Sequence, residues 1–91
     1  MTGEVRNNEA EHRYELEVEG QLALAAYRLS DGRITFTHTE VPDALEGRGI
    51  GSKLVKAALE DVRARGLKAV PACTFVKHYM EKHPEVQDLL A

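Results

Sequence analysis

The chain has 91 residues, of which 43% are hydrophobic and 30% are charged, and its formal net charge is -3. These values indicate one globular domain, and the mildly acidic charge argues against a nucleic-acid binder that depends on a broad basic face. No apolar run approaches the roughly 20 residues that span a bilayer, the first residues lack the apolar segment of a signal peptide, and a single cysteine cannot form an internal disulfide. We therefore expect a cytoplasmic protein that contacts neither nucleic acid nor membrane.

The N-terminal half contains three strand-like runs after a polar stretch. Residues 1–11 are rich in Glu and Asn, so we expect a flexible tail there. Apolar and charged residues alternate over residues 13–19, and a second run covers residues 21–29. The two runs predict a β-hairpin, although the alanines of the second run also fit a helix. A turn at residues 30–32 leads into a third run, residues 33–41, which is rich in Thr, Ile and Phe.

The third run ends in titratable residues. In an extended strand, Ile34, Phe36, His38 and Glu40 lie on one face, because side chains alternate between the two faces. Two apolar residues then share a face with two residues that can exchange protons. This pattern is typical of a functional site at a strand end, and it also fits a strand end that is simply solvated.

A glycine-rich loop, EGRGIGSK at residues 46–53, follows this strand. Glycine at alternate positions allows a tight turn whose N–H groups point toward one spot, and Arg48 adds a cation. An amphipathic segment begins near Ser52, so the loop leads into a helix N-terminus, which favours phosphate. The spacing matches neither the P-loop nor the dinucleotide-binding fingerprint. A turn that binds no ligand is the alternative.

The C-terminal half predicts a helix, a short strand and a second helix. Apolar residues recur at helical spacing after the loop, at Leu54, Val55, Ala58, Leu59 and Val62. Gly66 is the expected stop of this helix, and residues 67–72 predict a strand that follows a right-handed crossover. Thr74 is a candidate N-cap for a helix over residues 75–82, with further helical turns over residues 85–90.

The glycine loop resembles the acyl-CoA pyrophosphate loop of the GNAT acetyltransferase superfamily. That loop follows the pattern Q/R-x-x-G-x-G/A, and this chain has Glu46, Gly49 and Gly51 at the three defined positions, so the first position departs from the pattern. Two longer segments, TEVPDALEGRGIGSKLV and PACTFVKHYMEKHPEV, are similar to a family of very small, single-domain GNAT-like proteins. Together they cover about half of the chain.

The resemblance implies an α+β domain of minimal GNAT type over residues 12–91, with antiparallel strands, a central helix, one parallel strand and a short terminal helix. It implies an N-acetyltransferase that binds acetyl-CoA and transfers the acetyl group to an amine, such as a protein or peptide amine. We expect a monomer or a weak homodimer without a metal. Two other classes stay open: a CoA-binding or protein-interaction module with little turnover, and a loop that binds a nucleotide.

The same resemblance assigns cofactor-binding roles. The pyrophosphate would lie on the backbone of the loop, and the pantetheine arm would lie between the third strand and the strand at residues 67–72. A backbone N–H near Val41 would polarise the thioester carbonyl. The implied cofactor-binding residues are Val41, Glu46, Gly47, Arg48, Gly49, Ile50, Gly51, Ser52, Cys73 and Phe75.

Four residues are candidates for catalysis. Glu40 or His38 would be the general base that takes a proton from the incoming amine. Cys73 would carry or contact the acyl group, and its alternative is a small buried hydrophobe. Tyr79 would donate a proton to the departing CoA thiolate, and its alternative is packing in the core.

Overall fold

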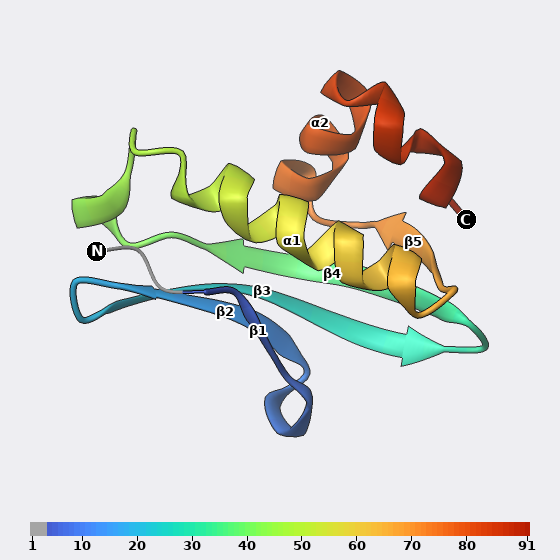
Figure 1. Cartoon of the computed structure of the whole chain (residues 1–91), viewed down its shortest axis with the longest axis horizontal. Helices are drawn as coiled ribbons and strands as arrows, with labels where there is room; N and C mark the ends of the chain where they lie inside the picture. Colours follow the sequence, from blue (N-terminus) through green and yellow to red (C-terminus); the bar gives the residue numbers. More distant parts are fainter. Residues whose placement is uncertain (1–3) are drawn as a thin grey trace.

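The computed structural model describes residues 4–91. It contains a five-stranded sheet in the order β1-β2-β3-β4-β5, with both α-helices on one face (Figure 1). Neighbouring strands are antiparallel except β4 and β5, which are parallel. The elements are β1 (Arg6–Asn8), η1 (Glu9–Glu11), β2 (Arg13–Val18), β3 (Gln21–Ser30), β4 (Arg33–Glu40), η2 (Asp43–Leu45), α1 (Ile50–Ala64), β5 (Lys68–Pro71), α2 (Thr74–Lys82) and η3 (Pro84–Leu89), where η marks a 3-10 helix. This arrangement confirms the α+β fold expected from the sequence and adds an edge strand.

The added strand, β1, lies in the segment that we expected to be a flexible tail. It pairs with β2 in antiparallel register, with Arg6 opposite Glu15 and Asn8 opposite Arg13. Glu15 is 2% exposed and accepts hydrogen bonds from all three of these partners. The expectation of a tail is therefore wrong for residues 6–8, because composition alone does not reveal the buried carboxylate that joins them to the sheet. Residues 1–3 lie outside the described part of the chain.

Helix α1 packs its apolar face on the sheet, as its sequence pattern predicts. All five predicted core residues are buried, and the helix begins at Ile50, before the expected start near Ser52. Gly66 ends the helix with a φ of 70°, and its N–H donates to the Arg63 carbonyl at 3.1 Å. The Leu67 N–H reaches back to the Val62 carbonyl at 3.0 Å, which completes a Schellman cap.

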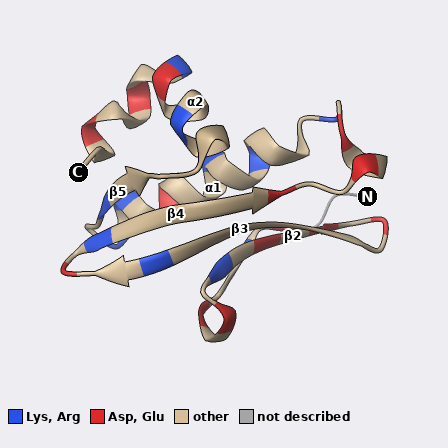
Figure 2. Cartoon of the chain, turned by 180° about the vertical axis from the view of Figure 1, so that it is seen from behind, with Lys and Arg blue, Asp and Glu red and all other residues tan. Residues whose placement is uncertain are grey.

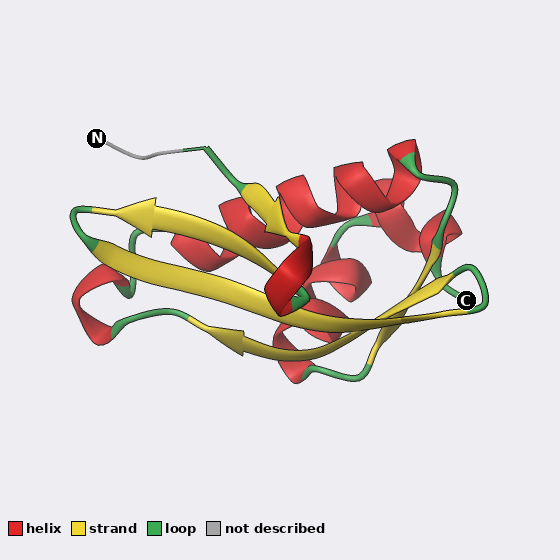
Figure 3. Cartoon of the chain, turned by 90° about the horizontal axis from the view of Figure 1, so that it is seen from below, coloured by secondary structure: helices red, strands yellow, loops and turns green. Residues whose placement is uncertain are grey.

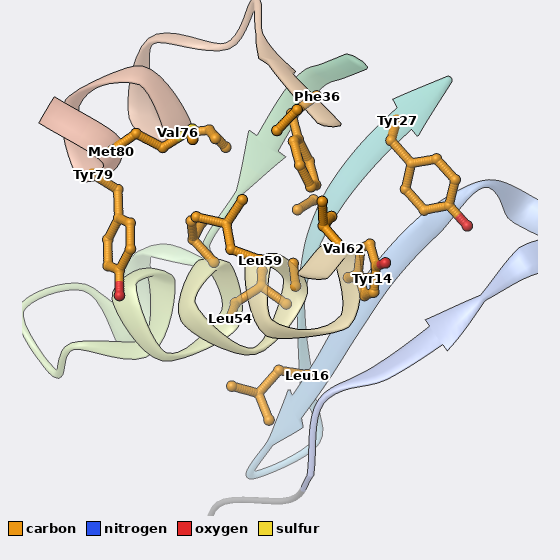
Figure 4. Packing of buried hydrophobic residues seen from close by; sticks show 14 of the residues in the cluster. Tyr14, Leu16, Tyr27, Phe36, Leu54, Leu59, Val62, Val76, Tyr79 and Met80 are labelled. Carbon is orange, nitrogen blue, oxygen red and sulfur yellow. The ribbon is translucent and has the colours of Figure 1, made fainter. Parts of the chain in front are cut away.

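The centre of the sheet presents small and aromatic side chains to the helices. On β3 the buried residues are Ala23, Ala25 and Tyr27, whereas Leu22 and Leu24 alternate with them on the other face and are only partly buried. The two alanines leave room for α1, and Figure 4 shows the Tyr27 ring beside the core aromatic side chains.

The other face of the sheet, called the open face below, carries no α-helix within residues 4–91 (Figure 3). Neither helix of this part of the chain is long and apolar enough to cross a membrane.

A β-bulge interrupts β4 near its end. Tyr27 pairs with Phe36, and the preceding residue Ala26 pairs with His38, so Thr37 is an additional residue in β4. An additional residue reverses the alternation of faces for everything that follows it in the strand.

The bulge changes which side chains face the helices. Beyond it, Thr39 lies opposite the buried Ala25 and therefore faces the helices, while Glu40 lies opposite Leu24 on the open face. The expectation that His38 and Glu40 share a face with the apolar residues of this strand is wrong. It assumed an uninterrupted strand, and no residue type in this segment marks the bulge.

Candidate active site

The loop before α1 leaves the start of the helix uncapped by any side chain. Gly47 and Gly49 have φ angles of 79° and 72°, and Gly49 is the N-cap residue. The Lys53 N–H donates to the Gly49 carbonyl at 3.0 Å, and the first turn contains no acidic residue. The N–H groups that precede Lys53 in α1 have no carbonyl partner within the helix, so this terminus favours an anion.

A groove of about 880 Å³ opens at this helix start. One wall consists of the loop and the first turn of α1, and the other consists of the end of β4 with Thr39, Glu40 and Val41. Leu22 lines it on the side of the open face, and Phe75 lines it on the side of the helices. The volume is in the range of ligand-binding pockets, and the groove joins an anion-favouring terminus to the edge of the sheet.

The parallel strands part before the segment of β4 that lines the groove. Pairing between β4 and β5 ends with Phe36 opposite Pro71, and a further backbone hydrogen bond follows, in which the Cys73 N–H donates to the Phe36 carbonyl at 2.9 Å. Beyond this point the chain turns into α2 while β4 continues to Glu40. The end of β4 therefore has β3 on one side and the groove on the other.

Phe75 forms the helix-side wall by packing on α1. A Cβ at Gly51 would lie 2.6 Å from the Phe75 ring carbon Cζ, so the ring needs glycine at this position. The ring is 40% exposed although it belongs to an apolar residue. An exposed aromatic wall beside an uncapped helix is suited to contact with an elongated organic ligand.

Cys73 and Thr39 contact each other beside the groove. Their Sγ and Oγ1 atoms are 3.2 Å apart, and Cys73 is the N-cap residue of α2. Burial alone would raise the pKa of the Cys73 thiol, but the Thr39 hydroxyl and the amides at the start of α2 together lower it below its ordinary value. Thr39 lines the groove, so the thiol lies next to the groove. The arrangement favours a reactive thiolate.

Glu40 and His38 lie together on the open face. The Glu40 Oε2 atom is 2.8 Å from the His38 Nε2 atom, and the side chains are 60% and 59% exposed, respectively. Glu40 lines the groove. His38 is not among the lining residues, and it contacts the Glu40 side chain. A carboxylate at the groove's open-face end can accept a proton from a group that approaches from that side.

Tyr79 is separate from the other candidates. It is 8% exposed, it stacks on the His83 ring at a centroid distance of 3.9 Å, and it belongs to the hydrophobic core (Figure 4). Its surroundings include Lys56 and Glu60 on α1, away from the residues that line the groove. Burial raises the pKa of its hydroxyl, with further contributions from Glu85 and Glu60. The geometry fits the packing alternative.

The two charged side chains of the loop differ in their contacts. Glu46 is exposed and lines the groove, while the Arg48 guanidinium forms an ion pair with Glu19 in the turn between β2 and β3. Sequence reasoning missed Glu19, Thr39 and Leu22. No local signal identifies them, since strand pairing and the bulge bring Leu22 and Thr39 to the groove, and the turn between β2 and β3 brings Glu19 to Arg48.

These features agree with the comparisons with known proteins. A mixed sheet of this topology, with a glycine loop between an antiparallel strand and a helix, is the fold class of GCN5-like proteins. The chain belongs to the GCN5-related N-acetyl-transferase family, whose sequence profile matches residues 13–89. The resemblance noted in the sequence is thereby confirmed.

Two kinds of relatives extend this comparison. A GCN5-like protein from Staphylococcus aureus, solved by NMR, is 36% identical and superposes with a TM-score of 0.75 over 97% of this chain and 87% of its own. Protein NATD1 of Homo sapiens and that of Gallus gallus are each 45% identical over 56 residues, which is 62% of this chain. The chain spans about half the length of these curated relatives, 50% and 51% respectively.

Proposed function

We propose that the protein binds acetyl-CoA in the groove and transfers its acetyl group to an amine, with protein or peptide amines as acceptors. The observation that carries this proposal is the continuity of the groove, which runs from the uncapped start of α1 to the end of β4 at Thr39, Glu40 and Val41. One end suits a pyrophosphate, and the other offers polar groups suited to acyl transfer. Family membership supports the same reaction class.

The backbone of the glycine loop would hold the pyrophosphate. The N–H groups of residues 48–52 supply donors without help from the Glu46 carboxylate, which would repel a phosphate. Phe75 would pack along the pantetheine arm, and Val41, which lines the groove after the end of β4, would donate its N–H to the thioester carbonyl. Bound acetyl-CoA supplies the activated acetyl group.

Two routes for the transfer follow from the side chains present. In the first, Glu40 removes a proton from the acceptor amine, the amine nitrogen attacks the thioester carbonyl, the C–S bond breaks, and CoA leaves as a thiolate that takes a proton from solvent. In the second, the Cys73 thiolate attacks the thioester and CoA leaves in the same way; the amine then attacks the acetyl-Cys73 thioester, loses its proton to solvent and releases the Cys73 thiolate. The short contact between Thr39 and Cys73 supports the second route, and the exposure of Glu40 supports the first.

Release of CoA in the presence of amines tests the reaction. The experiment measures free CoA from acetyl-CoA with a panel of amines that includes lysine peptides, for the unaltered protein and for Glu40→Gln and Cys73→Ala. We expect CoA release that depends on the amine. Whichever of Glu40→Gln and Cys73→Ala removes the group that the reaction uses should lower this rate on the order of 100-fold or more. His78→Gln serves as a control at an exposed position outside the groove.

The alternative is a CoA-binding module with little turnover, and the position of Tyr79 outside the groove favours it, because the predicted proton donor is then missing. The transferase proposal fails if the protein binds CoA but Glu40→Gln and Cys73→Ala release CoA at the same rate as the unaltered protein. The alternative of a CoA-binding module then stands.

A further inference from the structure

We propose that Glu19 competes with the phosphate groups of CoA for Arg48 and thereby sets the affinity of the groove for its ligand. The inference rests on the CoA binding proposed above. Arg48 lies between two glycines of the loop, and its Nη2 atom lies 2.5 Å from the Glu19 Oε2 atom. Figure 1 places the turn between β2 and β3 at the same end of the molecule as the segment that precedes α1. A loop that binds phosphate thus has its arginine already paired with a carboxylate.

The turn itself does not explain the presence of glutamate. Glu19 and Gly20 have φ angles of 51° and 77°, which is the two-residue turn with positive φ at both positions. The turn between β3 and β4 has the same geometry, with Asp31 at 49° and Gly32 at 78°. Asp is favoured at such a position, whereas Glu lacks the short side chain that stabilises it. The contact with Arg48 accounts for the longer carboxylate.

The ion pair is built in a way that permits exchange. The Arg48 and Glu19 side chains are 47% and 54% exposed, so solvent screens their attraction and the pair contributes little to stability. A phosphate group offers a higher negative charge and a geometry that a guanidinium binds well. When the ligand takes Arg48, the Glu19 carboxylate remains nearby and repels it.

The surroundings increase this effect. Asp43, Glu46 and the two glycines that flank Arg48 line the groove, and acidic residues gather at this end of the sheet while basic residues gather at the opposite end (Figure 2). While Arg48 is paired with Glu19, its charge is balanced within the protein. Glu19 therefore acts as a positioning residue that lowers phosphate affinity, and its removal should tighten binding.

A double-substitution cycle tests the competition. Calorimetric titration with CoA would compare the unaltered protein, Glu19→Gln, Arg48→Gln and the double variant, with Asp31→Asn as the matched change in the other turn. We expect Glu19→Gln to tighten CoA binding roughly two- to fivefold at low salt, as an exposed pair allows, and to change nothing in the Arg48→Gln background. The gain should shrink as salt rises. Binding of S-acetylpantetheine, which has no phosphate, should be unaffected.

The titrations distinguish failure of this inference from failure of the proposed function. CoA binding that is equal or weaker in Glu19→Gln, or a gain that persists without Arg48, overturns this inference alone. No CoA binding by the unaltered protein overturns the proposed function and this inference with it. A gain for Glu19→Asn, whose side chain suits the turn, supports the competition even if Glu19→Gln proves unstable.

Discussion

At the scale of single residues, the thiol proposed for catalysis contacts one side-chain hydroxyl. Cys73 is the sole cysteine of the chain, and the Thr39 hydroxyl is its hydrogen-bonding side-chain partner within the described residues. Burial opposes ionisation of the thiol, while this hydroxyl and the amides at the start of α2 favour it. The outcome is a thiol whose pKa is lower than usual, next to a groove that is suited to an acyl donor.

Thr39→Val should raise the pKa of Cys73, because it removes the hydroxyl that stabilises the thiolate while burial remains. Alkylation of Cys73 at neutral pH should then slow, and its rate-versus-pH curve should move to higher pH. Because the chain has one cysteine, the rate reports this thiol directly. Thr37→Val is the control, since Thr37 lies on the same strand as Thr39 but its hydroxyl donates to the Ala26 carbonyl of β3. An unchanged curve for Thr39→Val would show that the contact does not tune the thiol.

At the scale of elements, the bulge in β4 decides what each face of the site can do. It sends Thr39 toward the helices and Glu40 toward the open face, so the thiol partner and the candidate base lie on opposite sides of the same strand. An acyl donor that enters beside α1 and an acceptor that approaches from the open face could then meet at the end of β4.

The edge strand β1 depends on a buried carboxylate. Burial alone would raise the pKa of Glu15, but hydrogen bonds from Arg13, Asn8 and Arg6 lower it below its ordinary value of 4.5. A carboxylate with a lowered pKa in the folded state stabilises the fold above the ordinary pKa, and this contribution is lost as the pH falls through the folded-state value.

Glu15→Gln should therefore destabilise the protein at pH 7 by about 1–3 kcal/mol, because the ionic hydrogen bonds are lost while the site stays buried. Urea denaturation would measure the difference from the unaltered protein at pH 7 and again in acid, where the difference should shrink. Glu17→Gln, at an exposed position of the same strand, is the control. A difference that is equal at both pH values would contradict the role of the charge.

The elements differ in how far the sequence predicts them. The α1 pattern predicts its buried face correctly, because a helix that packs on a sheet must place apolar residues at a fixed period, and Gly66 marks its end by its φ. Residues 6–8 and the bulge at Thr37 were not predictable. A three-residue strand and an additional residue in a strand are stabilised by contacts with distant segments, which leave no local pattern.

At the scale of the whole molecule, one face of the sheet holds the helices and the groove's aromatic wall, and the other is open (Figure 3). The glycine loop could be predicted from sequence as a tight turn that leads into a helix, since glycine spacing before a helix is a local signal. The contributions of Leu22, Thr39 and Glu19 could not, because they come from β3, from β4 and from the β2–β3 turn, which reach the loop only after the sheet has formed. The site is thus a product of the fold, with the loop as its one local part.

The central claim is that the loop binds the phosphates of acetyl-CoA through its backbone, and calorimetric titration of two glycine variants tests it most directly. Gly49 and Gly66 have φ angles of 72° and 70°. At both positions an alanine Cβ would meet no neighbouring atom within 4 Å, so alanine imposes similar backbone strain at both. Only Gly49 lies in the loop. We predict that the unaltered protein and Gly66→Ala bind acetyl-CoA alike, and that Gly49→Ala binds roughly 10- to 100-fold more weakly, as expected for loss of contacts to a charged group. Equal binding by the two variants, or none by the unaltered protein, would contradict the claim.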